Sequence, residues 1–360
     1  MRFLLIAFYV LLSTLPLLGC VPRGALSGAA STAASDGKRS GSPLVLARQG
    51  SFFVNQENIL TSFPKGTGTP DAGHISARGM YVQYQIPQDR NESAYQIIMV
   101  HGSSHTGKTY EETPDGRMGW AEYMVRKGVP VYVVDHAGRA RSGFDPSPGN
   151  RAKIEGNPEL IPSFARFTNE QAWTAFRFGP KPFIPHEDTR FPIVAQDEYF
   201  AQMVPNTETS YLKGGQNTVA ALAALLDRIG PAVVLVHSQS GEYGIGAAIA
   251  RPDLVKAVVS VEPRNCAMSD SDIQGVFSHV PLLIIFGDFF GAEAGTDWPM
   301  RMAECVDTVD RIKAVGGTAE NIYLPDFGIR GNSHMLMMDV NNLQIADMML
   351  VWLARNAPVR

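Results

Sequence analysis

The feature that most constrains the fold is an unbroken apolar run, Val233–Val236, that leads through His237 into Ser238–Gly241 and a glycine-spaced stretch beyond. The run predicts a buried strand, and the residues after it predict a helix. A sharp turn between the two would hold Ser238 on a strained backbone. Its hydroxyl would be exposed, and the next N–H would be free to stabilise an oxyanion. The pattern therefore indicates covalent hydrolytic chemistry.

Short apolar runs that predict strands recur along the chain, at residues 44–47, 52–54, 80–86, 97–100, 129–134, 233–237, 257–261, 282–286 and 322–324. Amphipathic helical patterns lie between the later runs, at residues 215–229, 302–314 and 341–356. This alternation predicts an α/β fold with a mainly parallel central sheet, flanked by helices on both faces. A chain of 360 residues, 45% hydrophobic and 18% charged, suits one large domain with an insertion, or two modest domains.

The stretch from about Asp145 to Tyr211 interrupts the alternation. It is rich in proline and in aromatic residues, which are Phe164, Phe167, Trp173, Phe176, Phe178, Phe183, Phe191, Tyr199 and Phe200. Because it lies between a predicted strand and the helix before the elbow, we expect a cap insertion over the catalytic edge of the sheet. Its aromatic residues would line an apolar acyl or aromatic pocket. Alternatively, they form the small core of the cap itself.

The N-terminus reads as a targeting segment. An apolar run there is too short for a membrane span, so we expect residues 1–20 to be an export signal. Leu17–Cys20 resembles the lipobox of bacterial lipoproteins, which predicts lipidation of Cys20 and a periplasmic or membrane-anchored protein. Signal cleavage further on, with secretion, is the alternative. Residues 21–43 are rich in Gly, Ser and Ala and predict a flexible linker, so the folded domain would span residues 44–360.

Composition limits the partners and cofactors. The net charge of −4 leaves no basic surplus to neutralise phosphates, which argues against a nucleic-acid partner and favours a small neutral or weakly charged substrate. No Cys/His cluster has metal-ligand spacing, so we expect no metal site. Apart from Cys20, the chain contains Cys266 and Cys305, which in an oxidising compartment form one disulfide or remain two buried thiols.

Four motifs appear in an order that resembles the α/β-hydrolase superfamily over roughly residues 45–355. His101-Gly102 after a strand resembles its oxyanion loop, and Asp135–Gly143 resembles the Asp, Gly and Ser-Gly pattern after its next strand. Val236–Gly241 resembles its nucleophile elbow, and Gly331–His334 its late histidine loop. The resemblance implies the α/β-hydrolase fold and a serine hydrolase.

The elbow departs from the G-x-S-x-G pattern of the family at two positions. Val236 stands where the first glycine is expected, and Ser240 replaces the second. Small residues there let the strand and the helix approach each other, so Ser240 fits and Val236 is an anomaly. We predict Ser238 as the nucleophile. Ser240 is the alternative, although it would place Glu242 at the crowded position that follows.

A base must remove the serine proton, because a serine hydroxyl is a poor nucleophile at its own pKa. After the elbow, His279 precedes a strand and should fall at the wrong end of the sheet, whereas His334 follows the last strand. We therefore predict His334 as the base. The acid that orients it is Glu262 or Asp288, which end successive strands.

A branch of bacterial cap-bearing esterases carries a glutamate as this acid. The chain resembles that branch in its His-Ser-Gln-Ser-Gly elbow and in Val261-Glu262-Pro263. The resemblance favours Glu262 and leaves Asp288 as the alternative.

An acyl-transfer intermediate needs two backbone donors for its negative oxygen. We predict the N–H of Gln239, directly after the nucleophile, and the N–H of Ser103, directly after His101-Gly102. The resemblance implies a carboxylesterase-type enzyme that hydrolyses small or medium hydrophobic esters through an acyl-enzyme, without a cofactor. Lactonase, thioesterase and amidase activities on the same fold are alternatives.

One segment also fits another class of enzyme. Gly102–Thr109 matches the phosphate-binding pattern G-x-x-x-x-G-K-[ST], and Asp135 could act as the strand-end aspartate near magnesium. However, Pro114 would soon interrupt the required helix, and the elbow would be left without a role. A P-loop nucleotide hydrolase is therefore a remote alternative. A third hypothesis, a non-enzymatic lipoprotein on this scaffold, would be expected to lose a triad residue, yet all three have candidates.

Overall fold

The computed structural model describes residues 42–359, except for residues 69–70, 162–163, 208–214 and 292–296. The predicted export signal, Cys20 and most of the predicted linker lie outside the described residues. Within the described ranges, no helix is both long enough and apolar enough to span a membrane.

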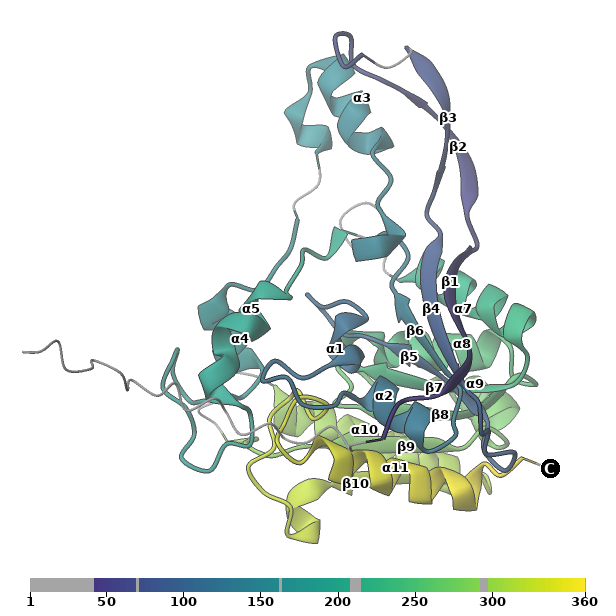
Figure 1. Cartoon of the computed structure of the whole chain (residues 1–360), viewed down its shortest axis with the longest axis vertical. Helices are drawn as coiled ribbons and strands as arrows, with labels where there is room; N and C mark the ends of the chain where they lie inside the picture. Colours follow the sequence, from purple (N-terminus) through teal and green to yellow (C-terminus); the bar gives the residue numbers. More distant parts are fainter. Residues whose placement is uncertain (1–41, 69–70, 162–163, 208–214, 292–296, 360) are drawn as a thin grey trace, which may run out of the picture. The chain divides into compact units, whose positions relative to one another are not determined.

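An eight-stranded sheet forms the centre of the fold (Figure 1). Its strands, in spatial order, are β1 (Leu46–Val54), β4 (Met80–Pro87), β6 (Val131–Asp135), β5 (Gln96–Val100), β7 (Ala232–His237), β8 (Val255–Val261), β9 (Leu282–Phe286) and β10 (Ala319–Tyr323). The β1–β4 and β4–β6 pairs are antiparallel, and all pairs from β6 to β10 are parallel. The predicted mainly parallel sheet is confirmed, and its parallel strands bring their carboxyl ends to one edge.

Helices cover both faces of the sheet. The core on one face includes α2 (Trp120–Arg126) and α11 (Asn342–Asn356), and the core on the other includes α7 (Gln216–Ile229), α8 (Gly241–Ala250) and α10 (Trp298–Ala314). Because both faces are covered, all six residues of β7 are buried, which explains its unbroken apolar run. The shorter helical segments of the main fold are α1 (Lys108–Glu111), η1 (Ala140–Ser142), η4 (Ser238–Ser240), α9 (Asp270–Asp272), η5 (Ile273–Phe277) and η7 (Leu324–Phe327).

The sequence analysis missed one hairpin, formed by β2 (Glu57–Ser62) and β3 (Ala72–Ala77). These strands lie apart from the main sheet in Figure 1, and β2 contacts α3 (Ser147–Glu155). Most of their residues are exposed or half-buried, so burial does not require the apolar run by which the other strands were predicted. The two apolar runs predicted near the start of the domain instead form the single strand β1.

The described residues of 145–207 form an insertion segment and contribute no strand to the main sheet. The helical elements among them are α3, η2 (Pro158–Leu160), α4 (Asn169–Ala175), η3 (Ile193–Ala195) and α5 (Gln196–Ala201). Most of its predicted pocket aromatics are buried and pack on one another, as in the stacked pair Phe178 and Phe191, whose ring centroids lie 3.6 Å apart. Phe164 and Phe183 are about half exposed. The buried aromatic residues therefore mainly pack in a hydrophobic core, which they share with residues of β7 and β9.

Cys266 and Cys305 form a disulfide, with their Cα atoms 5.0 Å apart. Of the two possibilities that the sequence left open, the structure has the bonded one. The disulfide joins the loop after β8 to α10, and both cysteines belong to the hydrophobic core on one face of the sheet.

Candidate active site

Ser238 lies at the turn between β7 and α8, and its backbone is left-handed, with φ of 53°. This conformation is unfavourable for a residue with a side chain and is often found at functional sites. Ser238 is 8% exposed, and its carbonyl accepts a hydrogen bond from the Arg264 N–H (3.1 Å). The strand, turn and helix of the predicted elbow are therefore present, with Ser238 at the apex.

Ser240 has a different environment. Its hydroxyl oxygen accepts a hydrogen bond from the His237 N–H (2.8 Å) and lies within donating distance of the carbonyls of Val100 (3.0 Å) and His237 (2.9 Å). The residue is fully buried and its backbone is right-handed. Its hydroxyl thus ties the elbow to β5.

His334 and Glu262 meet at the same edge of the sheet. His334 Nδ1 lies 3.0 Å from Glu262 Oε2, and both side chains are almost completely buried. The other oxygen of Glu262 accepts hydrogen bonds from Arg177 Nη2 (2.5 Å) and from the Gly287 N–H. Glu262 is also left-handed, with φ of 52°. Its carboxylate is held from two sides and presents one oxygen to the imidazole.

Burial and charge act in opposite directions on this pair. Burial raises the pKa of Glu262, but the charge of Arg177 and the contact with His334 outweigh it, so that the pKa lies below its ordinary value. Burial lowers the pKa of His334, Glu262 opposes this, and Arg177 and Arg301 add to the lowering. The pair is therefore an ionised carboxylate beside a neutral imidazole at neutral pH.

Asp288, the alternative acid, has other partners. Its carboxylate accepts hydrogen bonds from the backbone N–H groups of Phe289 (2.7 Å) and Gly331 (2.9 Å). The Asp288 N–H donates to the Asn332 carbonyl (2.8 Å). Asp288 therefore shapes the loop that carries the histidine, while Glu262 contacts the imidazole itself.

His237 links the elbow to the histidine loop. Its Nε2 lies 3.0 Å from the His334 carbonyl, and the two imidazole centroids are 4.7 Å apart. Since His237 directly precedes Ser238, this contact brings the elbow beside the loop. No hydrogen bond joins the Ser238 hydroxyl to the His334 imidazole among the described residues. In ligand-free enzymes this contact is often long and tightens when substrate binds.

The predicted oxyanion loop approaches the elbow closely. A Cβ on Gly102 would lie 2.7 Å from His237 Nδ1 and 3.0 Å from Ser238 Cβ, so only glycine allows this approach. The next two residues are fixed by the insertion segment, because Asn206 donates to Ser103 Oγ (2.7 Å) and accepts from the Ser104 N–H (2.7 Å).

Buried Arg139 bridges the peptide group that precedes Ser103 and the side chain of Gln239. Its Nη1 donates to the Gly102 carbonyl (2.8 Å) and its Nη2 to Gln239 Oε1 (3.0 Å). The Gly102 carbonyl and the Ser103 N–H belong to one trans peptide and point in opposite directions. Arg139 therefore directs the Ser103 N–H away from itself. The Gln239 N–H lies at the start of the elbow helix, where no preceding turn supplies an acceptor.

Two residues of this site, Arg139 and Arg177, were not singled out from the sequence. Arg139 lies inside the Asp135–Gly143 motif, so the motif itself carried a signal. Arg177 lies in the insertion segment, 85 residues from Glu262, and no local pattern marks it.

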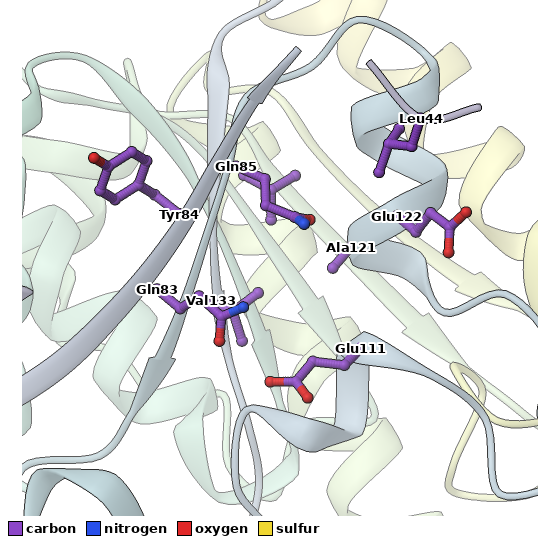
Figure 2. A pocket seen from close by; sticks show the side chains of 9 residues that line it. Leu44, Gln83, Tyr84, Gln85, Glu111, Ala121, Glu122 and Val133 are labelled. Carbon is purple, nitrogen blue, oxygen red and sulfur yellow. The ribbon is translucent and has the colours of Figure 1, made fainter. Parts of the chain in front are cut away.

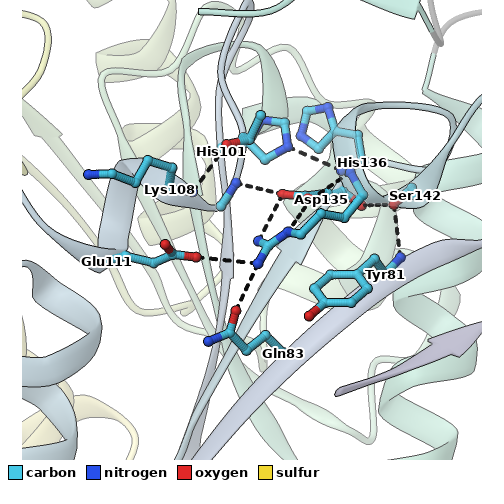
Figure 3. A network of polar contacts seen from close by, with 11 residues as sticks. Tyr81, Gln83, His101, Lys108, Glu111, Asp135, His136 and Ser142 are labelled. Atoms are coloured by element: carbon cyan, nitrogen blue, oxygen red, sulfur yellow. Dashed lines mark hydrogen bonds and ion pairs between the residues drawn. The ribbon is translucent and has the colours of Figure 1, made fainter. Parts of the chain in front are cut away.

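The segment that resembles a phosphate-binding loop is occupied by its own polar contacts, which Figure 3 shows around Asp135. The Gly107 N–H donates to Asp135 Oδ1 (2.7 Å), and Arg141 Nε donates to Asp135 Oδ2 (2.6 Å). Lys108 Nζ donates to the Glu112 carbonyl, and α1 is only four residues long. A carboxylate thus takes the amide that a phosphate would need, so the geometry does not fit a P-loop.

A surface pocket of about 190 Å³ lies near this network (Figure 2). Gln83, Gln85, Glu111 and Glu122 contribute polar groups to its lining, and Glu111 also pairs with Arg141. None of the candidate catalytic residues lines it.

Comparison with known proteins is consistent with this geometry. No protein-family model matches the chain. The chain is 39% identical to a bacterial esterase of known structure, with a TM-score of 0.83, and the match covers 89% of this chain and 99% of the esterase. It is 28% identical over 334 residues to the probable secreted lipase phiG of Fungal sp. (strain ATCC 74256), which covers 77% of this chain and 86% of the lipase. Together with the sheet and its flanking helices, these similarities show that the chain belongs to the α/β-hydrolase superfamily, in the same family of carboxylic-ester hydrolases as the bacterial esterase.

Proposed function

We propose that the protein cleaves esters by two-step acyl transfer, with Ser238 as nucleophile, His334 as general base and Glu262 as the acid of the triad. The observation that carries this proposal is the combination of a left-handed Ser238 at the elbow and a buried Glu262–His334 hydrogen bond at the same sheet edge. Ser240 is a poor candidate, because its hydroxyl is buried and engaged by backbone groups.

In the first step His334 Nε2 removes the proton of the Ser238 hydroxyl, and the oxygen attacks the ester carbonyl. The tetrahedral intermediate collapses as His334 donates that proton to the leaving alcohol. In the second step His334 deprotonates a water molecule, which attacks the acyl carbonyl. The bond to Ser238 then breaks as His334 returns the proton to the serine oxygen, and the acid is released. Glu262 accepts the Nδ1–H of His334 throughout, which keeps Nε2 free to take the proton.

The backbone N–H groups of Ser103 and Gln239 would stabilise the negative oxygen of each intermediate. Support comes from Arg139, which binds both the Gly102 carbonyl and the Gln239 side chain and so keeps the two halves of this site in register. No step requires a metal or an organic cofactor.

The insertion segment would act as the cap over this site. It contacts the oxyanion loop through Asn206 and the histidine loop through Phe176 and Arg190. The side chains that it brings to the edge include Phe176, whose ring stacks on His334 and tilts toward His105. An apolar roof of this kind favours a small or medium hydrophobic acyl group.

Labelling with a fluorophosphonate probe tests the nucleophile. We expect mass spectrometry of the labelled protein to place the adduct on Ser238. Ser238→Ala should abolish both labelling and hydrolysis of short aryl esters with an unchanged melting temperature, whereas Ser240→Ala should still be labelled at Ser238. An adduct on Ser240 would show that the nucleophile is misassigned.

We also propose that the protein is exported and anchored through lipidated Cys20. The support is the Leu17–Cys20 sequence together with the similarity to a protein described as a probable secreted lipase. Expression in a bacterium with radiolabelled palmitate should give a labelled protein in the membrane fraction, and Cys20→Ser should remove the label. A secreted, unlabelled wild-type protein would refute the lipid anchor and leave export intact.

A further inference from the structure

Arg177 of the insertion segment is buried directly behind the proposed acid. Its side chain is inaccessible, and its Nη2 lies 2.5 Å from Glu262 Oε1. Nε donates to the Asp288 carbonyl (2.7 Å), and the guanidinium lies 4.6 Å from the ring centroids of Phe290 and of Trp298. These contacts hold the guanidinium in place, with its positive charge next to the Glu262 carboxylate.

We propose that Arg177 is a positioning residue for ester hydrolysis, which holds Glu262 in the orientation that receives the His334 Nδ1–H and thereby makes the insertion segment part of the acid–base machinery. This inference rests on the triad proposed above. It assigns to the segment a second task besides covering the substrate.

The two oxygens of Glu262 have separate partners. Arg177 and the Gly287 N–H bind Oε1, and His334 binds Oε2. A carboxylate that is free to rotate could turn either oxygen away from the imidazole. Because Oε1 is fixed by a charge-assisted hydrogen bond, Oε2 stays directed at Nδ1.

The residue before Arg177 holds the other member of the pair. The Phe176 carbonyl accepts a hydrogen bond from the His334 N–H (2.9 Å), and its ring is parallel to the imidazole, with centroids 5.3 Å apart and an interplanar angle of 6°. Arg177 itself has a left-handed backbone, with φ of 59°. The strained backbone of Arg177 therefore occurs where two consecutive residues contact the proposed pair. Phe176 contacts His334, and Arg177 contacts Glu262.

The charge of Arg177 acts on both members of the pair in the same direction. It lowers the pKa of Glu262 against the opposing effect of burial, and it adds to the lowering that burial imposes on the pKa of His334. Arg301 from α10 also lowers the pKa of His334. Other titratable groups around the pair are His105 and His237, which burial keeps neutral, and Asp339 of the histidine loop, whose pKa is raised to about 6 mainly by burial and in part by the charge of Glu262. Arg177 therefore keeps the acid ionised and the base unprotonated.

Stability alone gives little reason for this pair. A buried ion pair can often be replaced by apolar residues of similar volume without loss of stability, because desolvation offsets the attraction. A single neutral replacement of Arg177 leaves the buried Glu262 carboxylate without its partner and should lower the free energy of unfolding by about 3–5 kcal/mol. The positioning role adds a separate prediction, that the enzyme that remains folded also loses turnover.

Arg177→Met and Arg177→Lys separate these roles. We expect Arg177→Met to lower kcat by about 10²-fold, the effect of a small misplacement of reacting groups, with KM little changed. The acid limb of its kcat/KM profile should move to higher pH, because both Glu262 and His334 bind protons more readily without the positive charge. Arg177→Lys keeps the charge but cannot form the same forked contacts, so it should recover part of kcat and have the wild-type acid limb.

The concentration of active enzyme is measured by titration with the fluorophosphonate, so that kcat is expressed per labelled serine. Arg166→Met is the matched control, since Arg166 belongs to the same segment but donates to the carbonyls of Phe200 and Met203 and not to a carboxylate. It should have wild-type kcat and an unmoved acid limb.

Three results would overturn the inference: Arg177→Met with unchanged kcat per labelled serine, a loss of kcat without movement of the acid limb, or a rise in KM alone. The last would make Arg177 a substrate contact. Glu262→Gln in the same assay separates this failure from that of the proposed triad. If Glu262→Gln keeps wild-type turnover, the triad itself is wrong, whereas an inactive Glu262→Gln beside an unaffected Arg177→Met overturns only the role of Arg177.

Discussion

Replacing Glu262 with glutamine should damage both catalysis and stability, and the structure gives the reason for each. Glutamine has the shape of glutamate but only one accepting oxygen. That oxygen can face Arg177 or His334, and the amide nitrogen then points a donor at the other. Either Nδ1–H of the imidazole or a buried guanidinium loses its acceptor.

The expected magnitudes follow from these two losses. Changing the carboxylate of a serine triad to its amide typically lowers kcat by about 10⁴-fold, because the histidine adopts the wrong tautomer. Removing one partner of a buried ion pair typically lowers the free energy of unfolding by about 3–5 kcal/mol. For a domain of this size, the melting temperature should fall by roughly 5–8 °C.

Asp288→Asn is the control. Asp288 accepts only from backbone N–H groups, and an asparagine oxygen can keep one of them. We expect kcat within about tenfold of wild type, since one hydrogen bond of about 1 kcal/mol is lost outside the imidazole contact. The assay is hydrolysis of a short p-nitrophenyl ester per titrated serine, with melting followed by circular dichroism. If Asp288→Asn were the inactive variant and Glu262→Gln the active one, the acid would be Asp288 and the argument from the 3.0 Å contact would be wrong.

Two further predictions concern the disulfide and the pH profile. Because 39 positions separate Cys266 from Cys305, loop-closure entropy predicts that Cys266→Ser/Cys305→Ser lowers the free energy of unfolding by about 4 kcal/mol without changing kcat at 25 °C. Guanidinium denaturation of both proteins measures this, and equal midpoints would contradict it. Burial and Arg177 lower the pKa of His334, so kcat/KM should stay constant down to below about pH 6.5 and then fall as the imidazole gains a proton. An acid limb above neutral pH would contradict this environment.

The edge of the sheet that carries the proposed catalytic residues could be predicted from the sequence, because two of these residues directly follow strands. Ser238 and Glu262 directly follow β7 and β8, which pair in parallel, so their carboxyl ends must be neighbours. His334 follows the last strand in a loop with its own hydrogen bonds. Strand order and chain direction therefore fix these positions before any side chain is placed.

Contacts made by the insertion segment could not be predicted in this way. Arg177, Phe176 and Asn206 reach the edge from a segment without strand periodicity, and each contacts a residue far away in the sequence. The β2–β3 hairpin was missed for a related reason, since its residues face solvent and lack the alternation that burial imposes. Where tertiary contacts rather than a repeating pattern hold a segment, local sequence carries little signal.

Val236 is an anomaly in the elbow motif that packing explains. The family pattern places glycine there so that the strand and the following helix can approach each other. Here the small residue is Gly244 of the helix, which makes room for the Val236 side chain. A Cβ on Gly244 would lie 2.9 Å from Val236 Cγ1 and 3.1 Å from Val236 Cγ2. The valine and the glycine therefore compensate each other across the β7–α8 contact.

A double-mutant cycle tests this compensation, because the effect of Gly244→Ala on the free energy of unfolding should change sign when Val236 is replaced. Gly244→Ala gains about 1 kcal/mol of helix propensity, but forcing a methyl group against Val236 loses about 1–3 kcal/mol, so we expect a net loss of stability. In Val236→Ala the same substitution should stabilise the protein, because the new methyl group fills the space that the valine leaves. Gly275→Ala, where an added Cβ meets nothing within 4 Å, measures the effect of the methyl group without crowding. Urea denaturation of the four cycle members gives the coupling. If Gly244→Ala were as stabilising as Gly275→Ala in the wild-type background, the elbow would tolerate Val236 for some other reason.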